Sequence, residues 1–142
     1  MFSISNNIMQ AIQGTEITIE SVPVESAISI LSAIEKKYVD SSRKSRCLWD
    51  RFADYAYVND SDSWKKIKDF INDKSCIMFF NEDDDKRMYK ILNGEDLNYI
   101  LSETFGFEFY ITNEITSFVI CFNDHDILYG VGDAKQWIET IS

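Results

Sequence analysis

The sequence predicts an α+β fold: one domain in which several helices pack against an antiparallel sheet. Three observations support this. Apolar residues recur at helical spacing through much of residues 1–75, strand patterns dominate residues 76–131, and a last helical pattern closes the chain. The 142 residues, 45% hydrophobic and 14% aromatic, are enough for one packed core. No linker-like tract interrupts them, so we expect a single domain over residues 1–142.

Helical patterns dominate the first third of the chain. Residues 3–13 are expected to form a short helix that ends at Gly14, and the alternating residues 15–21 a half-buried strand. Pro23 suits the first turn of a helix, where its missing N–H costs nothing. Apolar residues at helical spacing then predict a helix over residues 23–39.

Two further helices are expected before the strand-rich half. Residues 41–60 combine a helical stripe of Leu48, Phe52 and Tyr55 with flanks typical of a loop, and we interpret them as a short helix. Residues 61–71 begin with capping residues and place their apolar side chains on one face. This pattern predicts another helix, with its lysines on the solvated side.

The strand patterns begin at Cys76. The continuous apolar run CIMFF, residues 76–80, is typical of a strand buried on both faces. Residues 87–92 follow an acidic loop and are the expected hairpin partner. Asn93 can then cap a helix, and Gly106 suits the left-handed position at its C-terminal end.

A meander and a closing helix are expected in the last third. Residues 107–111 alternate, residues 116–122 are apolar on both faces, and residues 126–131 follow after a few polar residues. These three strands would be antiparallel neighbours. Gly132 then leads to Asp133, whose side chain can cap a final helix.

Negative charge is concentrated in the second half of the chain. The net charge is −10 at pH 7; residues 1–75 carry 11 acidic and 10 basic side chains, whereas residues 76–142 carry 13 acidic and 4 basic. Such a field repels nucleic-acid phosphates and anionic lipid and attracts cationic proteins. We therefore expect neither a nucleic-acid nor a membrane partner. The charge is equally consistent with a role in solubility alone.

Cysteine usage and the N-terminus favour a cytoplasmic protein. Cys47, Cys76 and Cys121 are odd in number and form no C-x-x-C pair, so neither a disulfide framework nor a zinc site is indicated. Only Cys47, beside Arg46, has a neighbouring cation to lower its pKa. No basic residue precedes Lys36, and no apolar run approaches the ~20 residues of a membrane span. No motif indicates a cofactor or a metal.

The only histidine, His125, lies in the connection Asn123-Asp124-His125-Asp126 between two expected strands. Asn and Asp tolerate the left-handed conformation and bond their own backbone, so a turn is the favoured interpretation. A catalytic role would need a nucleophile and an orienting group, and the chain contains no G-x-S-x-G motif to present a serine. We therefore expect His125 to be dispensable.

Four consecutive carboxylates, residues 82–85, follow the strand predicted at residues 76–80. Read as a calcium loop from Asp83, the run places Arg87 and Met88 where a ligand and an invariant glycine belong. Calcium is therefore disfavoured. A solvated loop and a docking site for a cationic partner are the two interpretations that the pattern supports.

An enzymatic alternative rests on Asp126, Asp133 and Lys135. Their order is similar to the D…(D/E)-x-K arrangement of metal-dependent nucleases, in which carboxylates hold Mg²⁺ and the lysine helps to activate water. Here the pattern lies at an expected helix cap, and the surrounding negative charge opposes a phosphodiester. We expect no enzymatic activity, with a divalent-metal hydrolase as the less favoured alternative.

The stretch FGFEFYITNEITSFVICFNDHDILYGVGDAKQWI, residues 105–138, resembles the C-terminal segment of small bacterial immunity proteins, which neutralise contact-dependent growth inhibition toxins and other polymorphic toxins. The resemblance covers about a quarter of the chain. It implies a cytoplasmic toxin inhibitor that binds the C-terminal toxin domain delivered by a neighbouring bacterium. Many such toxins are nucleases with basic clefts, which an acidic protein can occupy or block. A regulatory or adaptor domain that binds another basic cytosolic protein is the alternative.

The expected partner-binding site is acidic and has one aromatic anchor. Charged side chains would steer a cationic domain, and an exposed aromatic would supply apolar contact. The candidate residues are Glu82, Asp83, Asp84, Asp85, Asp124 and Asp126, with Tyr89 as the anchor.

Overall fold

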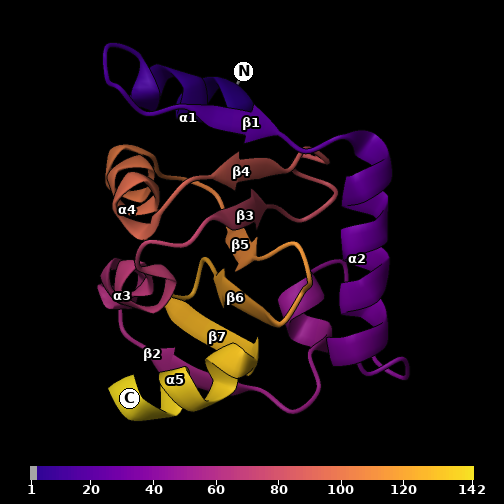
Figure 1. Cartoon of the computed structure of the whole chain (residues 1–142). Coiled ribbons are helices and arrows are strands. Elements are labelled where there is room, and N and C mark those ends of the chain that lie inside the picture. The colour runs from indigo at the N-terminus through magenta and orange to yellow at the C-terminus, as the bar shows by residue number, and fades with distance from the viewer. Residues whose placement is uncertain (1–2) are drawn as a thin grey trace.

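Seven strands form one antiparallel sheet in the order β1-β4-β3-β5-β6-β7-β2 (Figure 1). The computed structural model describes residues 3–142. The strands are β1 (Ile19–Ser21), β2 (Ala56–Asn59), β3 (Cys76–Phe79), β4 (Tyr89–Ile91), β5 (Phe109–Thr112), β6 (Phe118–Phe122) and β7 (Ile127–Gly132). Consecutive strands β5, β6 and β7 lie side by side, so the predicted meander is confirmed, as is the β3–β4 hairpin.

Helices cover both faces of the sheet, and the predicted α+β fold is confirmed. The α-helices are α1 (Ile4–Ile12), α2 (Val24–Tyr38), α3 (Ile67–Ile71), α4 (Gly94–Glu103) and α5 (Asp133–Ile141); the short 3-10 helices are η1 (Leu48–Arg51) and η2 (Ser63–Lys66). Figure 1 shows α2 on one side of the strands and α3, α4 and α5 on the other. Within residues 3–142, no helix has the length and apolar character needed to cross a bilayer.

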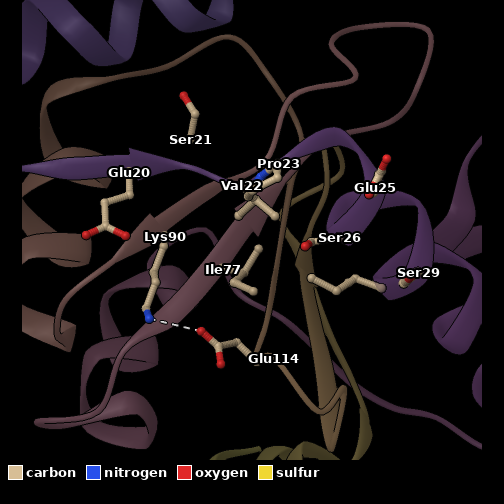
Figure 2. A pocket seen from close by; sticks show the side chains of 11 residues that line it. Glu20, Ser21, Val22, Pro23, Glu25, Ser26, Ser29, Ile77, Lys90 and Glu114 are labelled. Atoms are coloured by element: carbon tan, nitrogen blue, oxygen red, sulfur yellow. Dashed lines mark hydrogen bonds and ion pairs between the residues drawn. The ribbon is translucent and has the colours of Figure 1, made fainter.

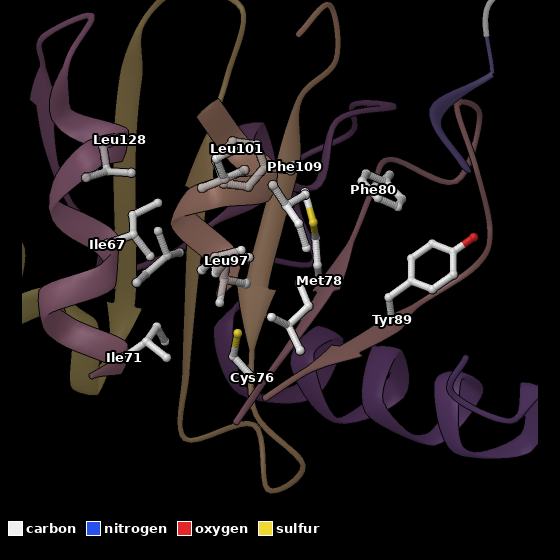
Figure 3. Close-up of a cluster of buried hydrophobic side chains, with 14 of the residues drawn as sticks. Ile67, Ile71, Cys76, Met78, Phe80, Tyr89, Leu97, Leu101, Phe109 and Leu128 are labelled. Carbon is white, nitrogen blue, oxygen red and sulfur yellow. The ribbon is translucent and has the colours of Figure 1, made fainter. Parts of the chain in front are cut away.

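Alternation along the strands divides the core into two layers. In β3, Cys76 and Met78 face α3 and α4 (Figure 3), whereas Ile77 and Phe79 face α2. Since successive side chains of a strand point to opposite faces, a strand covered by helices on both sides is apolar throughout. This explains the continuous apolar run that begins at Cys76.

Two local features determine where α4 begins. The side chain of Asn93 accepts a 2.8 Å hydrogen bond from the backbone N–H of Asp96, as the predicted cap requires. Gly94 lies so close to α3 that an added Cβ would approach the carbonyl oxygen of Lys68 to 2.5 Å. A capped N-terminus and a close helix–helix contact therefore fix where α4 begins.

The helix predicted within residues 41–60 is wrong in most of its length. Only residues 48–51 are helical, as the 3-10 turn η1, and residues 56–59 form the edge strand β2. Tyr57 and Val58 pair with Tyr129 and Leu128 of β7. The pairing with β7 is a long-range contact, and it outweighs the weak local helical pattern of this segment.

Candidate protein-binding surface

Three connections of the sheet meet at one of its ends. Residues 80–88 follow β3, residues 104–108 precede β5, and residues 123–126 join β6 to β7. Because these strands are antiparallel neighbours, their connections adjoin, and the two acidic segments expected from the sequence come together. We call this region the acidic end; its carboxylates are Glu82, Asp83, Asp84, Glu108, Asp124 and Asp126.

A buried carboxylate, Glu108, holds the acidic end together. Its Oε1 accepts hydrogen bonds from Asn81 Nδ2 at 2.7 Å and from Trp49 Nε1 at 3.1 Å. Its Oε2 accepts from the backbone N–H of Asp124 at 2.9 Å. The hydroxyl of Tyr110 donates to Asn81 Oδ1 at 2.6 Å and accepts from the Trp49 backbone N–H at 3.1 Å. Four segments distant in sequence are thereby joined.

The donors around Glu108 are all uncharged. Glu108 is 7% exposed, and within residues 3–142 it forms no ion pair. Its hydrogen bonds satisfy the carboxylate, but they leave its negative charge uncompensated. This charge adds to the field of the exposed carboxylates around it, and a cation from outside would relieve the field.

Asp83, Asp84, Glu108 and Asp124 line a shared hollow of about 300 Å³. Partial burial, followed by the negative charges of Glu108 and Asp84, raises the pKa of Asp124 above its ordinary value. The protein therefore holds carboxylates close enough to repel one another. Such an arrangement is unfavourable alone and becomes favourable when a cation arrives.

The negative charge of the acidic end also affects the pKa of the Cys47 thiol. Burial, followed by the charge of Glu108, raises the pKa of Cys47, so the expectation that Arg46 would lower it is wrong. The Arg46 guanidinium is almost fully exposed and lies 4.0 Å from the Asp83 carboxylate. Cys47 is thus held as a neutral thiol.

The connection that contains His125 is a turn, as predicted. Asn123 Oδ1 accepts from the backbone N–H groups of His125 at 2.9 Å and Ile127 at 3.1 Å. Asp126 has a φ of 60°, the left-handed conformation that Asp tolerates. The ring of His125 meets Trp49 edge-on, with centroids 6.1 Å apart.

Four aromatic side chains lie beside the acidic end, on the α2 side of the sheet: Trp49 and Tyr129 are half-buried, and Tyr55 and Tyr57 are exposed. Trp49 stacks on Tyr129, with ring centroids 5.6 Å apart and an interplanar angle of 20°. Tyr129 in turn contacts Tyr55 at 5.3 Å and Tyr57 at 6.2 Å. Tyr57 is 58% exposed on the edge strand β2. Tyr and Trp are the side chains most often found at the energetic centre of protein interfaces.

Two of the residues expected in the binding site are instead structural. Tyr89 is 5% exposed, so it is not the exposed anchor that was expected; Figure 3 shows its ring in the core, with the hydroxyl pointing away from the cluster. That hydroxyl is hydrogen-bonded to Ser5 Oγ, which donates to Asp85 Oδ2 at 2.9 Å. Asp85 also pairs with Arg87 at 3.1 Å, and its side chain is 8% exposed. Glu82, Asp83, Asp84, Asp124 and Asp126 are exposed.

The three residues of the hydrolase alternative do not form one site. Asp126 precedes β7 and Asp133 follows it, so the strand separates the two carboxylates by about 20 Å. The Lys135 ammonium forms an ion pair with the carboxylate of Asp54, which is not one of the three residues. Within residues 3–142, no group of three or more His, Cys, Asp or Glu side chains has a geometry that could hold a metal ion.

A larger hollow, of about 570 Å³, lies between the N-terminal half of α2 and the strands β1, β3 and β4. Figure 2 shows Lys90 and Glu114 joined by an ion pair across it, at 2.9 Å, with Ile77 between them and the helix. Glu20 and Glu25 complete its charged lining. Its one lysine is already neutralised, so this hollow offers no free cation to an anionic ligand.

Comparison with known proteins identifies no relative. No protein-family model, no curated protein and no solved structure matches the chain. The function must therefore be inferred from the geometry and charge of the acidic end and its neighbouring aromatics.

Proposed function

We propose that this protein is an immunity protein that binds and neutralises a cationic bacterial toxin domain through its acidic end. The observation that carries the proposal is the convergence of residues 82–84, Glu108 and residues 123–126 at one end of the sheet. Glu108 and Asp124 repel each other there. A cationic group of the partner would attract both carboxylates and offset their repulsion.

The acidic end and the exposed aromatics supply different parts of a binding surface. Long-range attraction steers a cationic partner and raises the association rate, whereas desolvated aromatic contacts slow dissociation. Trp49 is linked to Asp124 through the Trp49–Glu108 and Glu108–Asp124 hydrogen bonds. Trp49 also stacks on Tyr129, which contacts Tyr57. A basic surface with an apolar centre therefore complements this region.

The mode of inhibition follows from the charge. A nuclease cleft is basic because it holds phosphates, and an array of fixed carboxylates competes for the same cations. The carboxylates of the acidic end would cover such a cleft or its approach. Substrate and inhibitor would then exclude each other.

The experiment uses the protein encoded immediately upstream, expressed as its variable C-terminal domain. The domain is expected to kill cells that lack the present chain, to spare cells that contain it, and to bind it with nanomolar or lower Kd. The association rate is expected to fall as salt rises. A domain that neither kills nor binds would end the proposal, and binding without toxicity would favour an adaptor domain instead.

A further inference from the structure

The strand β2 forms one edge of the sheet (Figure 1). The backbone N–H of Asp60 donates to the carbonyl oxygen of Asp126 at 3.0 Å, one position beyond the last pair of β2 and β7. Hydrogen-bonding directions alternate along an antiparallel strand. Tyr57 and Asn59 therefore turn their backbone N–H and C=O groups away from β7, and within residues 3–142 no strand pairs with β2 on that side.

The residues of β2 leave this edge open to a further strand. Soluble proteins usually protect an edge with proline, lysine or a bulge. The sequence of β2 is Ala-Tyr-Val-Asn, without proline or lysine, and it pairs with β7 in unbroken register. Tyr57 is 58% exposed, and Asn59 is exposed as well. A row of unpaired backbone donors and acceptors is matched most fully by the backbone of another extended segment.

The side chain of Tyr57 favours particular residues beside it. The centroid of its ring lies 6.3 Å from that of Tyr55 and 6.2 Å from that of Tyr129. Residues directly opposite each other in adjacent strands point to the same face, and aromatic and β-branched side chains pack well against an aromatic neighbour there. A strand added to β2 would therefore place such a residue against Tyr57 and enlarge the group of aromatic rings beside the acidic end.

The two ends of this edge differ in charge. Asp60 follows β2 and adjoins Asp126, and within residues 3–142 neither carboxylate forms an ion pair. At the other end of β2, the Lys135 ammonium neutralises Asp54. A lysine or arginine of an added strand would be attracted to the Asp60 end. A second copy of this chain would bring a net charge of −10 and the same carboxylates, so it would be repelled.

We propose that an extended segment of a cationic partner protein pairs with the outer side of β2 and continues the sheet. Antiparallel pairing is the more stable arrangement per residue. In that direction, a lysine or arginine beside Asp60 comes two or three residues before the aromatic or β-branched residue opposite Tyr57. This inference rests on the proposed function for the identity of the partner, but the open edge is tested on the isolated protein.

The direct probe is the acetylated and amidated peptide Lys-Arg-Val-Tyr-Val-Thr, whose tyrosine would lie opposite Tyr57 and whose basic residues would lie near Asp60. At saturating peptide, the backbone N–H groups of Tyr57 and Asn59 are expected to exchange with solvent about 10-fold more slowly, as measured by NMR. The N–H of Val58 already faces β7, and its exchange is expected to change little. Absence of binding, or binding without slower exchange at Tyr57 and Asn59, would refute the inference.

N-methylated peptides test backbone pairing separately from charge and side-chain contacts. In the proposed pairing, the N–H of the peptide tyrosine faces β2, and the N–H of the valine that follows it faces away. Methylation of the tyrosine nitrogen is therefore expected to weaken binding about 3- to 10-fold, and methylation of that valine nitrogen by less than about 2-fold. Equal effects would mean that the peptide binds through its side chains, which contradicts strand pairing.

Substitutions in the protein provide a further test. Asn59→Pro removes an outward-facing N–H at an edge position where proline leaves the bonds to β7 intact, and it is expected to weaken peptide binding about 3- to 10-fold. Asn59→Ala, which keeps the N–H, is the matched control. Thermal melts establish that both variants fold. Equal peptide binding by the two variants would rule out pairing at this edge.

Asp60→Asn tests the contribution of charge. The substitution keeps the Oδ1 acceptor that bonds the backbone N–H of Asp62 at 2.9 Å, but it removes the negative charge. Binding of the basic peptide is expected to weaken, whereas binding of an analogue with glutamine in place of lysine and arginine is expected to stay the same. Equal effects on the two peptides would contradict a role for Asp60 in attracting a cation.

Sedimentation of the free protein tests the alternative occupant. The protein is expected to be a monomer, because self-pairing brings like charges together. A dimer that Asn59→Pro dissociates would place a second copy on the edge and overturn the choice of a cationic partner.

The two proposals fail separately. Peptide pairing at β2 without a toxin encoded upstream would keep the open edge and remove the immunity function. Toxin binding that Asn59→Pro does not weaken would keep the immunity function and refute pairing at this edge.

Discussion

Trp49 and Glu108 lie 59 residues apart in sequence, and the indole Nε1 of Trp49 donates a 3.1 Å hydrogen bond to the Glu108 carboxylate. The bond joins the exposed rings of Tyr55 and Tyr57 to the acidic end, because Trp49 stacks on Tyr129, which contacts both. A buried charge thus serves as the structural centre of a region whose surface charges are available to a partner. Glu108 and the exposed carboxylates therefore have different structural roles, which mutation can separate.

Glu108→Ala is expected to destabilise the protein by about 2–3 kcal/mol, because it leaves the N–H donors of Trp49, Asn81 and Asp124 without their acceptor. Urea unfolding at pH 7 measures the change. Glu103→Ala is the control: this side chain is exposed, and its loss is expected to change stability by less than about 0.5 kcal/mol. Equal effects of the two substitutions would mean that Glu108 has no special structural role.

Reversing Asp124 and Asp126 to Lys is expected to slow association with the proposed toxin domain about 10-fold at low salt, and less at high salt, because steering acts through long-range charge. His125→Ala, between them, is expected to leave binding unchanged. Glu16→Lys with Glu139→Lys makes the same change in net charge at exposed sites outside the acidic end. Stopped-flow mixing gives the rates, and equal slowing by both pairs would show that only net charge matters.

The pKa of Asp124 is raised in the folded protein, so its ionised form opposes folding. This destabilisation is absent below the unfolded pKa, near 3.8, and appears as the pH rises through the higher folded pKa. Asp124→Asn is therefore expected to stabilise the protein at pH 7 and to have no stabilising effect at pH 3.5. Unfolding curves at both pH values decide this. A loss of stability at pH 7 would contradict the prediction.

The pKa of Asp85 is shifted in the opposite direction, to below its ordinary value. Burial alone would raise its pKa, but hydrogen bonds from Arg87 and Ser5 outweigh burial and lower it. Its stabilising effect is present at neutral pH and is lost as the pH falls through the folded pKa, which lies below 3.8. Asp85→Asn should cost about 1 kcal/mol at pH 7 and less in acid. Glu82→Gln, in the same loop but exposed, is the control and should show neither effect.

Gly130→Ala is expected to destabilise the protein by about 1–3 kcal/mol. A Cβ at this position would lie 2.6 Å from Ile138 Cγ1 and 2.8 Å from the carbonyl oxygen of Ala134, so α5 would have to move away from β7. Because one obstacle is backbone, shortening Ile138 cannot restore full stability. Thermal unfolding measures the loss; an unchanged Tm would show that α5 adapts freely.

The elements that the sequence predicted well have strong local signals. Asn93 caps α4, and the long apolar runs of β3 and β6 are buried on both faces, so pattern alone was sufficient. The strand β2 was missed because it is four residues long and is fixed by its pairing with β7, which no local pattern records.

The site was predicted in its charge but not in its organisation. Five of the six expected carboxylates are exposed, yet Glu108 was overlooked. A signal was present, because Glu108 lies between Phe107 and Phe109, directly before the fully buried strand β5, where a charged side chain needs hydrogen-bond partners. The burial of the Tyr89 side chain could not be predicted, because it depends on contact with Ser5, which is remote in sequence.

The contact between Ser5 and Tyr89 gives α1 a second structural role besides packing in the core. Ser5 accepts from Tyr89 and donates to Asp85, so the first helix fixes the base of the loop from which Glu82, Asp83 and Asp84 project. The direction in which these charges face is consequently determined in part by a residue near the N-terminus, almost 80 residues away in sequence. A substitution at Ser5 would therefore alter the orientation of these charges while every acidic residue of the loop stayed the same.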